Sequence, residues 1–383
     1  MMPSAYITGL GVFLPNKPVS NEEIENVLGL INNKPSRCKN RILTNNGIKS
    51  RHYAIDPKTG KQTHTNAQLT AEAVRALCRN SNFPLEEIEC LVCGTSGPDQ
   101  LIPNHALMVH GELKSPPCEV VSTSGVCCSG VTALKYGYMN VLSGLTKNAV
   151  TTGSEVVSNA LRAAYFQSEI ESKIQELENK PVIGFEKDFL RWMLSDAATA
   201  VLIADTPSQD RISLRIDWID YISFANSLET CMYGGCVKRA DGSVQGWRDV
   251  DQPEEVWKQN YLAIKQDAKL LGENIINYGQ KGLAQIRDKY NLKTEEINWF
   301  LPHYSSEYFK EELYAKMAEI GVHITYDKWF TNLTTKGNTG SASIFVMLEE
   351  LMYSGKIERG DKIFCLVPES ARFSYAYMHM TAV

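Results

Sequence analysis

The sequence predicts an α/β protein whose sheet is covered by helices on both faces. Short apolar runs rich in strand-forming residues alternate with segments of helical periodicity, as in a sheet that is buried on both sides. A second series of the same kind begins near Ile212 and has a length similar to the first. We therefore predict two pseudo-duplicated α/β halves, residues 1–208 and 209–383, with a functional site where they meet.

The composition excludes several classes of protein. With 383 residues, 43% of them apolar and 22% charged, the chain can bury a substantial core without disulfides. The net charge of −5 argues against a dedicated nucleic-acid-binding protein, which normally carries a basic excess. No apolar run approaches the roughly 20 residues of a bilayer crossing, and the first residues lack the pattern of a secretory signal. We expect a cytoplasmic protein that binds neither membrane nor nucleic acid.

Strand and helix patterns follow one another regularly in the first half. An apolar strand is expected at 5–14, and Ser20 with the acidic residues after it has the pattern of a helix N-cap. The same periodicities predict strands at 89–95, 118–122, 149–155 and 198–205, and helices at 69–77 and 129–142.

One segment interrupts this order. Its middle, SEIESKIQELENK, is strongly charged and has helical periodicity, which is typical of an exposed insertion. We place this inserted helical segment around 158–190. It is either a solvated helix without a function of its own, or a lid or dimer arm.

The second half repeats the alternation. Helical periodicity covers 254–290 in more than one helix, and a strand is expected at 297–302. A helix at 342–351 and a strand at 362–367 complete the series.

The ten cysteines indicate a reducing compartment. Several lie inside apolar runs such as 90–94 and 363–368, where cysteine packs as a small hydrophobic residue. Cys90 and Cys93 have no second pair at zinc spacing, and a strand would direct their side chains to different faces. We therefore predict reduced thiols and no metal site.

Cys128 is the first candidate catalytic residue. It follows a predicted strand and a Ser/Gly turn, and it lies where the helix at 129–142 begins. Free N–H groups and the positive end of a helix lower the pKa of a thiol and can also accept an oxyanion. We expect the neighbouring Cys127 to pack as a buried hydrophobic residue.

His303 and Asn338 complete a candidate constellation. His303 closes the strand at 297–302, at the sheet edge where α/β proteins present catalytic groups. Asn338 lies in a glycine-bracketed loop before a helix, where it would also serve as an ordinary cap. A cysteine, a histidine and an asparagine at element ends can supply a nucleophile, a base or hydrogen-bond donor, and an orienting amide.

These segments resemble β-ketoacyl-[acyl-carrier-protein] synthase III, of the thiolase superfamily. Three signatures carry the resemblance: Cys128-Ser-Gly with Ala133-Leu134, Leu301-Pro302-His303, and the loop GNTGSAS at 337–343. The opening YITGLGVFLPN and the segments 47–52, 94–113 and 360–362 also match, so the resemblance covers nearly the whole chain. It implies the thiolase-like fold, with layered α-β-α-β-α architecture.

The resemblance also implies a reaction and its residues. Cys128 would take an acyl group from a thioester, and His303 and Asn338 would hydrogen-bond the carbonyl of the second substrate to stabilise its enolate. The backbone N–H groups of Cys128 and Ser370 would form the oxyanion hole. No cofactor is implied, because the substrates are carried on the phosphopantetheine of an acyl carrier protein or on coenzyme A. The family is typically homodimeric.

Departures from the family pattern bear on the substrate. Fatty-acid initiators have a glycine-rich loop where this chain has PESARF at 368–373, so Glu369 would bring charge to the substrate or carrier. Glu155 stands where the housekeeping enzyme carries Asp, and it is either an additional base beside the thiol or a helix cap or ion-pair partner. The segments PESARFSYAYM and FLPHYSSEYF resemble the ketosynthase branch that makes dialkylresorcinol and cyclohexanedione precursors.

That branch joins a β-ketoacyl thioester to an α,β-unsaturated acyl thioester. A Claisen condensation and a Michael addition together give a 2,5-disubstituted cyclohexane-1,3-dione. Two alternatives stay open: an ordinary initiator that condenses acyl-CoA with malonyl-carrier protein, and a catalytically silent partner subunit.

A basic run is the candidate docking surface for an acyl carrier protein or a CoA phosphate. Five basic residues fall between positions 35 and 55, a stretch without an acidic residue that ends at Asp56: Arg37, Lys39, Arg41, Lys49 and Arg51. Because the whole chain is net negative, an acidic carrier requires such a local basic surface. The alternative is a solvated face without a partner.

Overall fold

The core of the protein is a nine-stranded sheet built from both halves of the chain. The computed structural model describes residues 3–36, 38–165 and 189–383. The strand order is β13-β14-β15-β8-β1-β7-β6-β4-β5. These strands are β1 (Tyr6–Phe13), β4 (Cys90–Thr95), β5 (Glu119–Ser124), β6 (Asn148–Glu155), β7 (Ala197–Ala204), β8 (Leu214–Ser223), β13 (Ile297–Pro302), β14 (Lys362–Glu369) and β15 (Ser374–Ala382).

The helices and short strands complete the description. The helices are α1 (Ile24–Leu28), α2 (Lys39–Asn46), α3 (Asn66–Ser81), α4 (His105–Leu113), α5 (Ser129–Leu142), α8 (Glu254–Lys258), α9 (Ala268–Tyr290), α10 (Lys310–Glu319), α11 (Leu333–Lys336) and α12 (Ser343–Met352). The short strands are β2 (Val19–Ser20), β3 (Ser50–Arg51), β9 (Met232–Tyr233), β10 (Cys236–Lys238), β11 (Val244–Gly246) and β12 (Lys265–Gln266).

The two halves of the chain contribute strands in the same order. In the first half, β1 pairs antiparallel with β7, β7 antiparallel with β6, and β6 parallel with β4. In the second half, β8 pairs antiparallel with β15, β15 antiparallel with β14, and β14 parallel with β13. The two sets meet where β1 pairs with β8. This repetition is what an internal duplication would produce.

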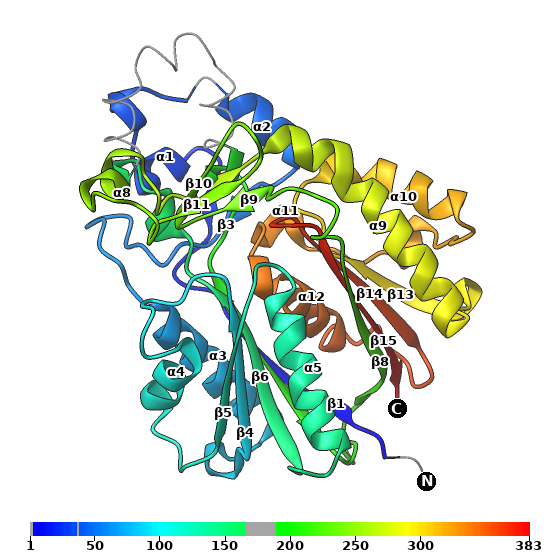
Figure 1. Cartoon of the computed structure of the whole chain (residues 1–383). Coiled ribbons are helices and arrows are strands. Elements are labelled where there is room, and N and C mark those ends of the chain that lie inside the picture. Colours follow the sequence, from blue (N-terminus) through cyan, green and yellow to red (C-terminus); the bar gives the residue numbers. More distant parts are fainter. Residues whose placement is uncertain (1–2, 37, 166–188) are drawn as a thin grey trace.

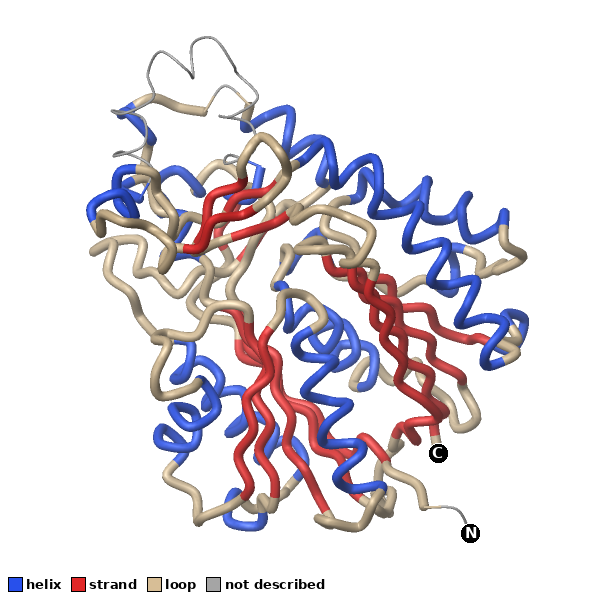
Figure 2. Tube along the Cα trace, viewed as in Figure 1, coloured by secondary structure: helices blue, strands red, loops and turns tan. Residues whose placement is uncertain are grey.

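The helices form layers on both sides of the strands (Figures 1 and 2). The helices α5 and α12 lie between the two halves of the sheet and share one apolar core with β1, β14 and β15. The helices α3 and α4 cover the outer face of the first half, and α9 and α10 cover that of the second. The predicted α/β class and thiolase-like layering are confirmed.

The element boundaries agree with the sequence periodicity where a strong pattern existed. The helix α5 has the predicted bounds, and α3 extends its predicted core because Thr65 and Gln68 form a capping box. The predicted cap at Ser20 is wrong: Ser20 belongs to β2, and α1 begins four residues later. The helical stretch at 254–290 is two helices, with β12 between them.

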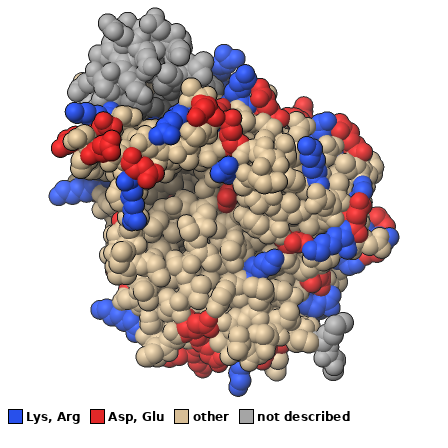
Figure 3. Space-filling view, in the orientation of Figure 1, with Lys and Arg blue, Asp and Glu red and all other residues tan. Residues whose placement is uncertain are grey.

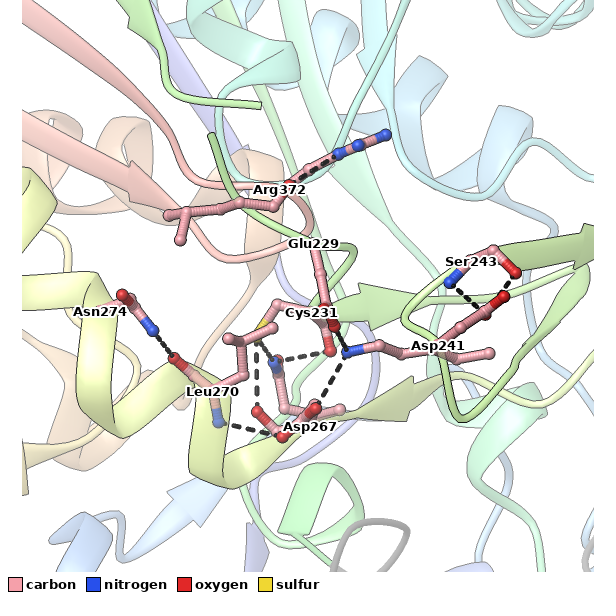
Figure 4. A network of polar contacts seen from close by, with 11 residues as sticks. Glu229, Cys231, Asp241, Ser243, Asp267, Leu270, Asn274 and Arg372 are labelled. Atoms are coloured by element: carbon pink, nitrogen blue, oxygen red, sulfur yellow. Dashed lines mark hydrogen bonds and ion pairs between the residues drawn. The ribbon is translucent and has the colours of Figure 1, made fainter. Parts of the chain in front are cut away.

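Residues 228–267 form a small ribbon beside the sheet. In it β9 pairs with β12, and β10 pairs with β11. Lys238 fixes the ribbon through ion pairs to Glu229 (3.0 Å) and Asp267 (3.1 Å), which Figure 4 shows together.

Most of the predicted insertion around 158–190 lies outside the described residues. No helix within the described ranges is long and apolar enough to cross a membrane.

Candidate active site

A deep, mostly apolar cavity lies where the two halves meet. Its polar lining includes His303, Asn338 and Glu155, three of the residues that the sequence singled out, and its apolar wall comes largely from α9 and the segment before β7. The other lining residues are Ser96, Val126, Cys127, Val157, Leu190, Met193, Leu194, Ser195, Met232, Ile264, Gln266, Leu271, Ile275, Ile276, Gly279, Tyr304, Ser305, Phe309, Leu313, Gly340, Leu366, Pro368 and Ser370.

His303 enters the cavity from the end of β13. Its backbone N–H donates to Leu366 O at 2.8 Å, which continues the parallel pairing of β13 with β14 by one residue. The side chain is buried, and burial lowers the pKa of the imidazole to about 4. At neutral pH the ring is therefore uncharged and carries one N–H that can donate to a substrate oxygen.

Asn338 enters from the loop before α12. Its N–H donates to Met193 O at 3.0 Å, and Ser195 N donates to its backbone oxygen at 2.8 Å, so the loop is fixed on both sides. The side-chain oxygen accepts Gly340 N at 2.9 Å. Because the oxygen is engaged, the amide nitrogen is the atom left to donate into the cavity.

Glu155 ends β6 and is 2% exposed. Its carboxylate accepts the Ser96 hydroxyl (2.5 Å), the Ser96 N–H (3.1 Å) and the Ser341 N–H (3.4 Å). Burial raises the pKa of this carboxyl to about 7, and the hydrogen bonds from Ser96 and Ser341 oppose the rise. A carboxyl that titrates near neutrality can accept and return a proton.

The two adjacent cysteines differ in whether they line the cavity. Cys127 lines the cavity with His303, Asn338 and Glu155, whereas Cys128 does not. Cys128 is fully buried, and its Sγ donates to Val367 O at 3.2 Å, on β14. Cys127 is packed in an apolar core, as expected, and it also lies at the cavity wall. The role of Cys128 as the nucleophile stays a prediction.

Neither thiol has the lowered pKa that a position at the start of a helix suggested. Burial raises the pKa of both cysteines well above the ordinary value, and the negative charge of Glu369 adds to the rise. The positive end of α5 is therefore offset by a carboxylate, which the sequence pattern of a helix N-terminus did not reveal.

Glu369 and Ser370 occupy the turn after β14. Ser370 lines the cavity, as the prediction of an oxyanion-hole amide requires. Glu369 is 7% exposed and is outside the residues that line the cavity. Its Oε2 accepts Val126 N at 2.9 Å and Cys128 N at 3.0 Å. This placement does not fit the predicted role of Glu369 in binding substrate or carrier.

The basic run that was predicted to be a docking surface is only partly exposed. Arg51 is fully buried, where it donates to Asn21 Oδ1 and Trp192 O, so the prediction that it contacts a carrier is wrong. Lys39 is engaged by Glu25 at 3.0 Å with little exposed side chain, and Arg37 lies outside the described residues. Arg41 is exposed on α2 and lines a second pocket.

This second pocket adjoins the central cavity. The two share Leu271 and Phe309, and Arg41, Asn45 and Tyr308 lie at the outer side. On the face shown in Figure 3, basic and acidic side chains are interspersed around a broad uncharged centre. Any attraction for an acidic partner on that face is therefore local.

Sequence reasoning missed Ser96 and Gln266. Ser96 follows β4 and gives Glu155 two hydrogen bonds, and Gln266 on β12 lines the cavity beside Ser370. A serine directly after a buried strand was a usable signal for the first. Gln266 lies in the ribbon, where the sequence had no pattern to place it.

Comparisons with known proteins agree with this geometry. Residues 288–367 match the family model of the 3-oxoacyl-[acyl-carrier-protein] synthase III C-terminal region. β-Ketoacyl-[acyl-carrier-protein] synthase III of Aquifex aeolicus is 24% identical over 93% of this chain and 93% of its own length. The corresponding protein of Clostridium perfringens is also 24% identical, over 94% of each chain. The chain is a condensing acyltransferase, and it is similar over nearly its whole length to enzymes of the ketosynthase III type.

Solved structures show the same fold for ketosynthases of different kinds. AbyA1, described as a tetronic acid condensing enzyme, has a TM-score of 0.75 with 17% identity and covers 98% of this chain and 99% of its own. Xanthomonas campestris OleA, solved with lauric acid and lauroyl-CoA, has a TM-score of 0.71 with 18% identity over the whole of both chains. The chain thus has a thiolase-like fold.

Proposed function

We propose that this ketosynthase condenses a β-ketoacyl thioester with an α,β-unsaturated acyl thioester and closes a six-membered 1,3-dione ring. The observation that carries the proposal is Glu155, a buried carboxyl that lines the same cavity as His303, Asn338 and Cys127, the neighbour of Cys128. A simple Claisen condensation needs a cysteine thiol, the imidazole and the amide. Ring closure needs a further proton transfer, and Glu155 can supply it.

The first step is acyl transfer to a cysteine. The thiol attacks the carbonyl of the unsaturated thioester, a new C–S bond forms, and the carrier thiol leaves with the proton. We assign this role to Cys128, the cysteine of the Cys-Ser-Gly signature where α5 begins, and Cys127, which lines the cavity, is the alternative. The oxyanion of this step would be held by the amides of the nucleophile and of Ser370, each donor being worth about 3 kcal/mol.

The second step forms the first carbon–carbon bond. A proton passes to water from the γ-carbon of the β-ketoacyl thioester, next to its ketone, and the enolate oxygen accepts hydrogen bonds from His303 and Asn338. The enolate carbon attacks the acyl-cysteine carbonyl, the C–C bond forms and the C–S bond breaks. The cysteine leaves as a thiolate and takes up a proton from water. Neutral donors suit this role, because they stabilise the charge that develops without a proton being lost from the enzyme.

The third step closes the ring. The carbon between the thioester carbonyl and the ketone loses a proton and adds to the β-carbon of the carbon–carbon double bond, whose α-carbon takes up a proton. The six-membered ring then still carries the thioester group. Glu155, with a pKa of about 7, can accept the first proton and return it to the second position. Its hydrogen bonds to Ser96 and Ser341 hold the carboxylate in place for both transfers.

Product analysis tests this proposal. The enzyme would be incubated with a β-ketoacyl and an unsaturated acyl thioester, and its products separated by mass. We expect a cyclic dione from the native enzyme, and an open-chain product from Glu155→Gln, which keeps the shape but cannot take up a proton. A native enzyme that makes only linear products would contradict the ring-forming function and favour the ordinary initiator.

The second pocket suits the arm that brings the thioester. Because this pocket shares Leu271 and Phe309 with the central cavity, we propose that phosphopantetheine enters there and that Arg41 contacts its phosphate. A carrier protein or coenzyme A would supply the same arm. No metal or organic cofactor takes part in the steps that we propose.

We also propose that the enzyme is a homodimer joined at β5. Within residues 3–36, 38–165 and 189–383, this strand is an edge of the sheet and pairs only with β4, so one row of its backbone groups is open to a second copy. Near it, the loop before α4 exposes Leu101 (61%) and Ile102 (85%), large apolar side chains that a second copy would cover.

A further inference from the structure

A buried carboxylate lies between the two segments that carry Glu155 and Asn338. It belongs to Asp196, which directly precedes β7 and is 0% exposed. The antiparallel pairing of β6 with β7 runs as far as Glu155 opposite Ala197 and ends there. Beyond that point the side chain of Asp196, rather than a backbone oxygen, accepts the amides of the segment that follows Glu155.

Four donors within the described residues bond to this carboxylate. Its Oδ1 accepts Val157 N at 2.8 Å and Ser158 N at 2.9 Å. Its Oδ2 accepts the Ser158 hydroxyl at 2.5 Å and Ala54 N at 2.7 Å. Burial raises the pKa of the carboxyl to about 6, so at neutral pH the group is mostly ionised. An ionised acceptor makes strong hydrogen bonds, and each donor that lost it would be left unpaired in the interior.

The residues just before Asp196 hold the loop of Asn338. Ser195 N donates to Asn338 O at 2.8 Å, and Asn338 N donates to Met193 O at 3.0 Å. A third segment fixes the same residues, because Asp196 N donates to His52 O at 2.8 Å and His52 N donates to the Ser195 hydroxyl at 2.9 Å. The carboxylate of Asp196 and the backbone of Asn338 are thus attached to one short segment, residues 193–196.

We propose that Asp196 is a positioning residue whose carboxylate sets the place of Asn338 relative to Glu155, so that both side chains enter one cavity. Glu155 and Asn338 are among the described residues that line this cavity, whereas Asp196 is not. Ser341 also joins the two segments, through its N–H to Glu155 at 3.4 Å and its hydroxyl to Ser154 O at 3.1 Å. The inference rests on the proposed function, and it deepens it by naming what sets the spacing of two groups that act on the substrate.

The two half-reactions separate positioning from a role in stability alone. In the proposed steps, acyl transfer to Cys128 uses neither Asn338 nor Glu155. Formation of the first carbon–carbon bond uses the Asn338 amide. A displaced Asn338 should therefore slow condensation and leave acylation unchanged, whereas a loss of folded enzyme would lower both rates by the same factor.

Three variants make this comparison. Asp196→Asn keeps the size of the side chain but turns an amide nitrogen toward two of the four donors, and Ser158→Ala removes the hydroxyl donor alone. Asp205→Asn, exposed just after the other end of β7, is the matched control. Acylation of Cys128 by an unsaturated acyl thioester would be timed by mass spectrometry. Condensation would be timed after adding a β-ketoacyl thioester to the acyl-enzyme, and thermal melting would show whether each variant folds.

We expect Asp196→Asn to acylate Cys128 within about threefold of the native rate and to condense about 100-fold more slowly, the loss typical of one misplaced oxyanion donor. Ser158→Ala should condense about fivefold more slowly with native acylation, and Asp205→Asn should match the native enzyme in both. Equal losses in the two half-reactions, or native condensation by a folded Asp196→Asn, would overturn the positioning role. If Asp196→Asn does not fold, the same comparison in Ser158→Ala decides.

Hydrogen exchange gives a readout that needs no catalysis. Peptides that contain Val157 and Asn338 should exchange their amide hydrogens faster in Asp196→Asn than in the native enzyme, and at the native rate in Asp205→Asn. Unchanged exchange at Asn338 would overturn the inference. A native enzyme that made only linear products would contradict ring closure, while the condensation rates would still test Asp196. If the native enzyme formed no condensation product and exchange still accelerated at both peptides, the proposed function would fail and the attachment of the two segments through Asp196 would stand.

Discussion

At the scale of single residues, burial moves the pKa values of two groups in the site in opposite directions, and each shift favours the uncharged form. His303 is held neutral, because burial lowers the pKa of its ring to about 4. Glu155 titrates near neutrality, because burial raises the pKa of its carboxyl to about 7. A neutral donor and a carboxyl poised to exchange protons are the pair that enolate formation and ring closure need.

The pH dependence of ring closure should follow Glu155. As the base, this carboxyl must be ionised, so the rate of cyclic product formation should fall as the pH drops through about 7. Glu155→Gln should form no cyclic product at any pH in the measured range. Rate measurements between pH 5.5 and 8.5 check this, and a native profile that is flat through pH 7 would exclude Glu155 as the base.

Replacement of His303 should separate the two half-reactions. His303→Ala removes a hydrogen bond to the enolate, so condensation should slow about 100-fold. Acyl transfer to the cysteine should persist, because the amides that hold its oxyanion are unchanged. The rate of adduct formation by intact mass spectrometry and the rate of product formation would be compared, and equal losses in both would contradict this role.

The sequence identified most of the site residues but not their exact orientation. His303, Asn338 and Glu155 were predicted because each follows a strand or precedes a helix, and all three line one cavity. Cys127 is buried as predicted, but the sequence did not show that it also lines the cavity, since adjacent residues in a turn point in different directions that no sequence period specifies. The contact from Glu369 joins residues far apart in the sequence, so no local pattern could show it.

At the scale of elements, glycines let the loops of the two halves approach each other. Gly340, in the turn after Asn338, has φ of +55°, and a Cβ there would lie 2.8 Å from Glu155 Cγ. A Cβ at Gly153 on β6 would lie 2.4 Å from Ser341 O. The loop that holds Asn338 can therefore lie directly on β6 only because both positions lack a side chain.

Two alanine substitutions test this reading. Gly340→Ala should lower the free energy of unfolding by about 1–2 kcal/mol or more, from strain at positive φ and the overlap with Glu155. Gly111→Ala, on α4 with open space around it, should raise that free energy by up to about 1 kcal/mol. Denaturant unfolding measures both, and equal effects of the two would contradict the close approach.

At the scale of the whole molecule, the sequence predicted the fold more completely than it predicted which residues are exposed. Two series of apolar strands and amphipathic helices predicted the layered architecture, because burial on both faces of a sheet leaves a strong pattern. The basic run at 35–55 failed as a predictor of a surface, because a residue such as Arg51 is buried by tertiary contacts that its neighbours in sequence do not reveal.

Dimer formation can be tested at an exposed side chain. Ile102 is 85% exposed in the single chain, so Ile102→Asp should leave the monomer folded and weaken a dimer that covers this loop. Sedimentation equilibrium should show a native dimer and a variant with a weaker association. Lys58→Asp, in the exposed loop at 56–61, is the control that should stay dimeric. A native monomer would contradict the proposed assembly.

The most direct test of the central claim is to find the acyl group. The native enzyme, Cys127→Ala and Cys128→Ala would each be incubated with an unsaturated acyl thioester, digested and mapped by mass spectrometry. The account predicts a stable acyl adduct on Cys128 in the native enzyme and in Cys127→Ala, and none in Cys128→Ala. An adduct on Cys127 that survives in Cys128→Ala would contradict it.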